Sequence, residues 1–215
     1  VGPGPGWLEF ATSLTYIAPS GQSKLPEPGQ DQGKRQGRES NGKARGPMAR
    51  LCFIDWDHQR LTALVAECGR NKAKILDSWS EETDLSPNPV MAEELGQFLK
   101  NRLKEKKQVV TGIVALVGRD RLVVRDQKYP AVNPSEEPGL VRLLTTKEVL
   151  DDPNDVIIDY QPWGSQEGKA EKRALVYVLR REMMSTYENL AKGAGVKLVG
   201  LSPRAMGLAA ALPQG

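Results

Sequence analysis

The chain has 215 residues with 30 basic and 27 acidic side chains, a formal net charge of +3. Residues 1–47 hold 9 of the 21 glycines, 6 of the 15 prolines, 6 basic and 4 acidic side chains, which leaves 24 basic and 23 acidic for residues 48–215. The larger part is therefore nearly neutral. This excludes a nucleic-acid binder that works by neutralising phosphates with a large basic surplus.

Targeting and metal signals are missing from the sequence. No run of about 18 apolar residues occurs, so no membrane span is predicted, and the start does not resemble a secretory signal. Cys52 and Cys68 do not make a disulfide framework, so both are expected to be buried thiols in a reducing compartment. With His58 as the one histidine, we expect no metal site.

Residues 1–47 are predicted to form a disordered tail rich in Gly, Pro, Lys and Arg, because this composition buries too little apolar surface to offset its ordering entropy. The first methionine, Met48, lies where the composition changes. Either translation starts at Met48 and the preceding segment is a wrongly assigned extension, or the tail is genuine. Peptides from 1–47 in mass spectrometry of the native protein would exclude the first interpretation.

The next segments predict strands, a helix and a buried strand. Residues 51–56, 61–68 and 72–80 are apolar or alternating runs separated by polar turns, which is typical of a three-stranded meander. Asn88 and Pro89 suit the first two positions of a helix, whose apolar face would comprise Met91, Leu95, Phe98, Leu99 and Leu103. Residues 109–117 form an almost unbroken apolar run, typical of a strand buried on both faces.

Residues 119–180 predict a strand, a helix and two strands. The strand begins at 122–124 and leads to the aromatic turn Tyr129-Pro130. The helix covers 136–150, with Leu140, Leu143, Leu144 and Val149 facing inward, and the last two strands are 155–161 and 173–179.

Residues 181–215 predict a helix, a strand and a second helix. The first helix ends at Gly195 and the strand covers 196–201. Ser202-Pro203 would start a last helix over 203–212.

Few residues suggest chemistry. The turn from Asp55 to Arg60 either points an acidic side chain at a phosphate-bound magnesium or is an ordinary polar hairpin turn. Asp151, Asp152 and Asp155 either hold a cation or belong to a solvated loop. The basic run 100–107 is a solvated helix face or is attracted to acidic lipid headgroups. No phosphate-binding glycine loop, dinucleotide motif or catalytic triad occurs.

Three stretches resemble a known family. Phe53 to Val65, the strand 156–161 with its Asp-Tyr-Gln ending, and 174–212 follow in the order and spacing of the PilM-like branch of the actin-like ATPase superfamily, which includes FtsA and assembly proteins of type IV pili and type II secretion. The resemblance covers about residues 50–212. It implies an α/β chain that is the first half of an actin-like, ribonuclease H-like fold, with an α+β insert of the strand-helix-strand-strand (SHS2) type.

The resemblance also implies domain limits. They are an actin-like subdomain from 48 to 118, the inserted unit from 119 to 180, and a return to the actin-like subdomain over 181–215. Because the second half of the fold is missing from the sequence, an apolar face would be left open, and self-association through it is a further expectation.

The family's first phosphate loop is degenerate in this sequence. Asp55 matches the family's Asp, but Asp57 stands at the Gly position and Thr62 at the Lys position. A glycine lets backbone amides approach a phosphate, whereas Asp57 adds negative charge that repels it. We therefore expect Asp55 to be a remnant of a cofactor-binding position, with no nucleotide or other cofactor bound and no enzymatic activity.

The function implied by the resemblance is a scaffold. PilM-like proteins receive a short cytoplasmic peptide of an inner-membrane partner resembling PilN, so this chain is expected to be cytoplasmic and peripheral at the inner membrane, in a pilus or a secretion system, without binding nucleic acid. The alternatives are an actin-like ATPase lacking its second half, a scaffold resembling FtsA, and a truncated gene product. A Gly-rich phosphate loop encoded after residue 215 would favour the ATPase.

Overall fold

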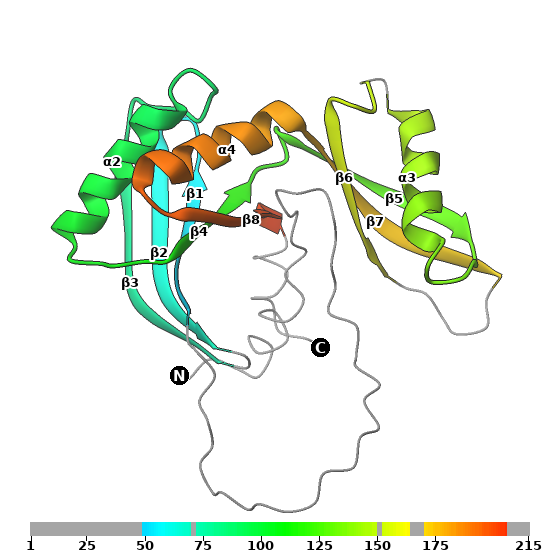
Figure 1. Ribbon diagram of the computed structural model, residues 1–215, viewed down its shortest axis with the longest axis horizontal. Coiled ribbons are helices and arrows are strands. Elements are labelled where there is room, and N and C mark those ends of the chain that lie inside the picture. The colour runs from blue at the N-terminus through cyan, green and yellow to red at the C-terminus, as the bar shows by residue number, and fades with distance from the viewer. Residues whose placement is uncertain (1–48, 70–71, 150–151, 164–169, 206–215) are drawn as a thin grey trace, which may run out of the picture.

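The protein contains two sheets of different size, seen side by side in Figure 1. The computed structural model describes residues 49–69, 72–149, 152–163 and 170–205. The first sheet has the order β3-β2-β1-β4-β8 and the second the order β5-β7-β6. The predicted tail, most of the predicted last helix and the turn residues Arg70 and Asn71 lie outside the described residues.

The five-stranded sheet combines a meander with parallel strands. Its strands are β1 (Ala49–Trp56), β2 (Arg60–Gly69), β3 (Lys72–Glu82), β4 (Gly112–Val117) and β8 (Lys197–Pro203). β1, β2 and β3 pair antiparallel, which confirms the predicted meander, while β1, β4 and β8 run parallel. The carboxyl ends of β1, β4 and β8 therefore meet at one edge of the sheet.

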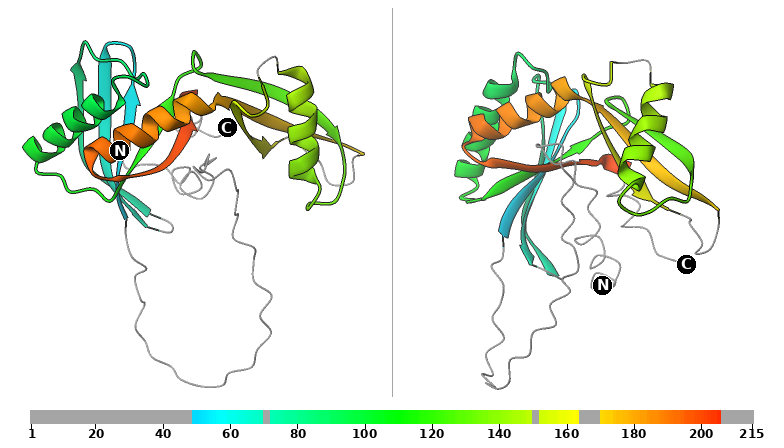
Figure 2. Two further views of the ribbon diagram at one scale, coloured as in Figure 1. Left: turned by 45° about the horizontal axis from the view of Figure 1, so that its top comes forward. Right: turned by 45° about the vertical axis from the view of Figure 1, so that its right-hand side comes forward.

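Two helices cover one face of this sheet, α2 (Ala92–Glu105) and α4 (Arg181–Ala194). Their buried side chains meet the inward residues of β1, among them Ile54 and Trp56, in one core. α4 continues toward the second sheet (Figure 2). As predicted, Gly195 ends α4, and its φ of 75° is a conformation that suits glycine.

The start of α2 and the end of β8 differ from the prediction. Asn88 accepts a hydrogen bond from the Met91 amide at 2.9 Å, so it caps a turn, and the helix itself begins at Ala92. β8 continues to Pro203, because Val117 and Pro203 still pair with each other at the end of the parallel ladder. Helical backbone begins at Arg204, one residue later than the predicted start at Pro203.

α2 and α4 approach each other closely at two glycines. A Cβ on Gly96 would lie 2.3 Å from the Leu190 carbonyl oxygen, and one on Gly193 would lie 2.7 Å from the Glu93 carbonyl oxygen. Because backbone atoms make these contacts, no side-chain rotation can relieve them. The two helices can therefore cross at this distance only while both positions lack a side chain.

The three-stranded sheet comprises β5 (Leu122–Pro130), β7 (Glu171–Arg180) and β6 (Val156–Pro162), and α3 (Glu137–Glu148) covers one of its faces. This is the predicted strand-helix-strand-strand order. Val141 is the fully buried apolar residue of α3, whereas Leu143, predicted to face inward, has 53% of its surface exposed. The buried face follows Glu137, Val141 and Thr145 at four-residue spacing, and Leu143 lies off that line.

A buried carboxylate links α3 to the sheet. Glu137 is 8% exposed, and it accepts hydrogen bonds from the Tyr129 hydroxyl at 3.1 Å and from the Lys172 ammonium at 2.7 Å. Burial, followed by the hydrogen bond to Glu137, raises the pKa of Tyr129 well above its usual range. Tyr129 is thus an inward strand residue and not part of a surface turn.

Candidate functional site

A cleft opens at the edge where β1, β4 and β8 end. Its volume is about 670 Å³, and strands of a parallel sheet present their ligand sites at this edge in many α/β folds. The lining comes from the end of β1, the β1–β2 turn, the start of β2, the end of β3 with the segment after it, and the residue after β8. It consists of Asp55, Asp57, His58, Gln59, Arg60, Thr62, Glu82, Thr83, Asp84 and Arg204.

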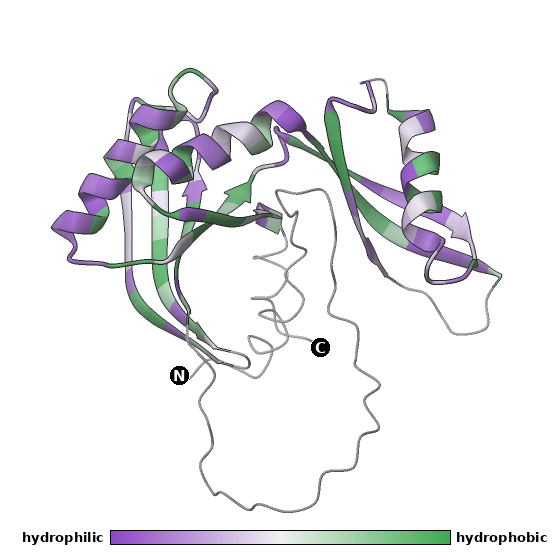
Figure 3. Ribbon diagram, in the orientation of Figure 1, coloured by the Kyte–Doolittle hydropathy of each residue, from purple (hydrophilic) through white to green (hydrophobic). Residues whose placement is uncertain are grey.

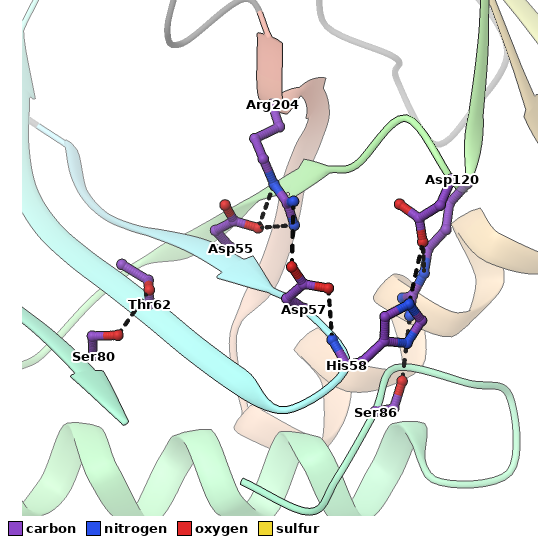
Figure 4. Close-up of polar contacts among 9 residues, drawn as sticks. Asp55, Asp57, His58, Thr62, Ser80, Ser86, Asp120 and Arg204 are labelled. Atoms are coloured by element: carbon purple, nitrogen blue, oxygen red, sulfur yellow. Dashed lines mark hydrogen bonds and ion pairs between the residues drawn. The ribbon is translucent and has the colours of Figure 1, made fainter. Parts of the chain in front are cut away.

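Asp55, the predicted remnant of a phosphate loop, binds Arg204, a residue that is distant along the chain but adjacent in space (Figure 4). The Arg204 guanidinium donates from Nη2 at 2.7 Å and from Nε at 3.0 Å to the same Asp55 oxygen. Burial alone would lower the pKa of Arg204, but its hydrogen bonds with Asp55 and the charges of Asp55, Asp57 and Asp120 outweigh burial and raise it. The two side chains form an ion pair and both are partly exposed.

Asp57 supports the β1–β2 turn. Its Oδ1 accepts from the His58 amide at 2.8 Å, and its own amide donates to the Arg60 carbonyl at 2.9 Å. That local amide hydrogen bond, together with the nearby Arg204 charge, keeps the pKa of the exposed Asp57 carboxyl below its usual range. Both amides that a phosphate would need at this turn are therefore already bonded.

A second group of charges continues the cluster from the β4–β5 connection. Asp120 lies 3.7 Å from the His58 ring nitrogen and 3.4 Å from Arg121, and Arg121 donates to the Ser86 hydroxyl at 3.3 Å. Gly118 permits this arrangement, because a Cβ there would lie 2.4 Å from an Asp120 oxygen. Charged side chains thus join all three parallel strand ends.

The charged side chains that line the cleft pair mostly with one another. Four carboxylates line it against two guanidinium groups, and Arg60 is engaged with Glu82 at 3.3 Å. The hydroxyls of Thr62 and Ser80 bond to each other at 3.0 Å and neither contacts a base. In the described ranges no group of three metal-ligating side chains comes together.

The other residues that the sequence suggested lie apart from the cleft. Asp152 accepts from the Asn154 amide at 2.8 Å and so forms a turn, while Asp151 lies outside the described residues. Cys52 is buried in β1, and burial raises its pKa to about 12. Burial also raises the pKa of Cys68. Neither cysteine is a reactive thiolate at neutral pH.

Arg204 and the Asp120–Arg121 pair were missed by the sequence analysis. A signal for both existed, since residues that directly follow parallel strands gather at one edge of a sheet. That rule requires the strand order, and the sequence placed a helix start, not a strand end, at Pro203.

Removing the Asp55–Arg204 pair tests its contribution to stability. We expect Arg204→Met and Asp55→Asn each to lower the free energy of unfolding, and the double variant to lose less than the sum. The coupling expected for such a half-exposed pair is about 1 kcal/mol. Urea denaturation of the four proteins measures it; additive losses would mean that the pair contributes nothing.

Comparisons with known proteins identify the fold. No family model matches the sequence, and no curated protein matches it. Among solved structures, the chain is similar to a "PilM-PilN type IV pilus biogenesis complex", at 18% identity and a TM-score of 0.64. The match covers 74% of this chain and 48% of the other, so the chain spans about half of the length of that structure. At this identity the likeness establishes the fold alone.

Two weaker similarities accompany it. The cytoplasmic domain of EpsL, an inner-membrane component of the type II secretion system of Vibrio cholerae, is 12% identical over 72% of this chain and 57% of that chain, with a TM-score of 0.47. A Bacteroides thetaiotaomicron protein of unknown function with an actin-like ATPase fold is 13% identical over 74% and 54%, with a TM-score of 0.36. Their TM-scores are too low to establish a shared fold. The predicted mixed α/β class is confirmed by the described sheets and helices.

Proposed function

We propose that this protein is a non-catalytic scaffold of a type IV pilus or type II secretion-like assembly, which binds a short peptide from an inner-membrane partner. The observation that carries the proposal is the fold shared with a chain that was solved as a PilM-PilN complex. A PilN-like peptide and a position at the inner face of the inner membrane belong to this proposal. No helix of the described segments has the length and apolar character needed to cross a membrane.

The proposed docking surface is the face of the three-stranded sheet that lies opposite α3. Side chains alternate along β5, so Val123 shares the α3 face with its partner Val178, while Val124 and Tyr177 lie on the other face. Val124 is 45% exposed. Leu179 and Tyr177 of this face are buried in the main core. The part of the face that could receive an extended apolar segment is therefore the part at Val124.

Asp159 gives this surface a charge preference. It lies on the same face, paired across the strands with Tyr177, whereas Tyr160 points to the α3 side and reaches Glu137 at 3.5 Å. Burial raises the pKa of Asp159, and the amide of Tyr160 is its hydrogen-bond donor. No cation within the described segments pairs with Asp159, so a peptide with a basic side chain would complement it.

The interactions within the cleft support the proposal that the protein is not catalytic. Arg204 is hydrogen-bonded to Asp55, and the backbone amides of Asp57 and His58 donate hydrogen bonds within the turn. Most of the charged side chains that line the cleft are acidic. A triphosphate would have to break the ion pair and approach four carboxylates. The proposal therefore includes no nucleotide and no metal cofactor.

Peptide binding tests this function. Labelled synthetic peptides covering the amino-terminal cytoplasmic segments of neighbouring single-span membrane proteins are titrated with the full chain and followed by fluorescence anisotropy. We expect one of them to bind, and Val124→Lys to weaken that binding about tenfold or more, because the lysine repels a basic peptide and fills the apolar surface.

Val123→Lys is the matched control. It makes the same change at the adjacent residue, which has 48% exposure but lies on the other face, so binding should stay within about twofold of the unchanged protein. Equal losses in both variants, or no binding by any peptide, would contradict the proposed surface. Retained nucleotide in the purified protein would instead favour the actin-like ATPase.

A further inference from the structure

Lysine side chains gather at one end of the five-stranded unit, where α2 and α4 end and β8 begins. They are Lys100, Lys104, Lys106, Lys107, Lys192 and Lys197, and we call them the lysine end. All six are exposed. Figure 3 shows the free end of α2 as strongly hydrophilic.

The tertiary structure brings these residues together from two distant segments. The Lys100 ammonium lies 3.9 Å from the point that a Cβ on Gly195 would occupy, so the side chain of Lys100 reaches the end of α4. Lys100 and Lys192 line one surface groove. Lys197 pairs with Gly112, a few residues after Lys107 along the chain.

Ion pairs within the described segments do not neutralise the charge of the lysine end. None of its six lysines makes an ion pair with an acidic residue of the described segments. Of the acids nearby, Glu81 and Glu105 bind Arg102 at 2.9 Å and 2.7 Å. Glu93 lines the groove together with Lys100 and Lys192, but it makes no ion pair with a lysine of the described segments. Helix C-termini favour cations, which accounts for Lys104 and Lys192 but not for the lysines outside the helices.

An exposed apolar side chain accompanies the lysines. Val109 is 74% exposed and lies two residues after Lys107, in the turn that leads from α2 to β4, while the neighbouring Val110 is 9% exposed. The backbone there is held by the bond from the Gln108 amide to the Leu103 carbonyl at 2.8 Å. An exposed apolar side chain among lysines is an arrangement that suits the boundary between headgroups and acyl chains.

We propose that the lysine end is a contact surface for an anionic phospholipid membrane. This membrane contact goes beyond the proposed function, because it does not depend on the binding of a partner peptide. Each basic residue near an anionic leaflet strengthens binding about fivefold, so six together give reversible attachment and a defined orientation. The lipid phosphates would supply the counter-charges that these lysines lack among the described residues.

A membrane fits these residues better than a nucleic acid does. The unpaired cations are all lysines, point charges that suit a diffuse anionic surface, while the arginine of this region is held by two carboxylates. Trp79, the aromatic residue next to the lysines, lies beneath Lys106 and packs against the core, so it offers no face for stacking a base.

Vesicle co-sedimentation of the full chain tests the proposal. We expect binding to phosphatidylcholine vesicles that contain phosphatidylglycerol, little binding to phosphatidylcholine alone, and a decrease with salt. The triple variant Lys104→Gln, Lys107→Gln, Lys197→Gln should bind at least about tenfold more weakly. Val109→Ser should weaken binding by about threefold at unchanged net charge.

The control triple, Arg119→Gln, Arg142→Gln, Lys147→Gln, removes the same charge from exposed sites away from the lysine end. It should bind the vesicles within about twofold of the unchanged chain. Equal losses in both triples would show that net charge or the basic tail causes the binding, and would overturn the proposal. Tighter binding to a single-stranded oligonucleotide, lost in the first triple alone, would overturn it in favour of a nucleic acid. Circular dichroism and melting temperature confirm that each variant is folded.

Discussion

Gly96→Ala is expected to lower the free energy of unfolding by about 3 kcal/mol, and Gly96→Val to prevent folding. The added Cβ would lie 2.3 Å from the Leu190 carbonyl oxygen and 2.8 Å from the Ala194 amide nitrogen. Both atoms belong to the backbone of α4, so the whole helix would have to move. That movement would separate the helices whose buried side chains form the main core. Urea denaturation measures the change.

Gly139→Ala is the matched control within another helix. No atom lies within 4 Å of the position of a Cβ there, and alanine stabilises a helix relative to glycine by about 0.5–1 kcal/mol. The same substitution should therefore be stabilising in α3 and destabilising in α2. A loss of stability at Gly139, or none at Gly96, would contradict the close crossing of α2 and α4.

The protein is expected to lose stability at alkaline pH through its buried tyrosines. Burial is the main cause that raises the pKa of Tyr160 to about 12, and that raises the pKa values of Tyr129, Tyr177 and Tyr187 above the usual value of 10.0. Folded molecules keep these protons while unfolded ones release them near pH 10.0. The stabilisation is thus fully present below pH 10.0 and is lost as the pH rises through about 12.

Denaturation curves at about pH 8 and about pH 11 measure this loss. A buried tyrosine such as Tyr187, which keeps its proton only in the folded state, contributes up to about 1.4 kcal/mol per pH unit. Tyr160→Phe should reduce the slope of stability against pH, since phenylalanine does not titrate. Stability that is the same at both pH values would mean that the four hydroxyls titrate normally in the folded protein.

The meander, the buried face of the first predicted helix and the strand-helix-strand-strand order could be predicted because they depend on local periodicity. The run from Leu61 to Cys68 and the spacing of Leu95, Leu99 and Leu103 each show which face is buried without reference to distant residues. Leu143 was placed wrongly for the same reason. Leu143 is apolar and lies close to the apolar face of the helix. Only the position of the three-stranded sheet decides that Val141, and not Leu143, lies at the centre of the buried face.

The predicted ends of strands and helices were wrong where pairing with a distant strand determines them. Pro203 pairs with Val117 across the sheet, and this non-local ladder continues β8 through a residue that local rules assign to a helix start. The misplacement concealed Arg204, which follows β8 and binds Asp55 across 149 positions of the chain. A contact between residues so far apart in the sequence produces no pattern in the sequence around either of them.

The sequence by itself determined the neutral composition of residues 48–215, the order of the elements, and the acidic character of the turn that holds Asp55 and Asp57. The tertiary structure decided that Asp55 is bound by Arg204, that Val123 and Val124 face opposite sides, and that six lysines gather at one end. The physical reason is that composition and periodicity are local or averaged quantities. Ion pairs and charged surfaces depend on which distant residues the parallel strands and the crossing helices bring together.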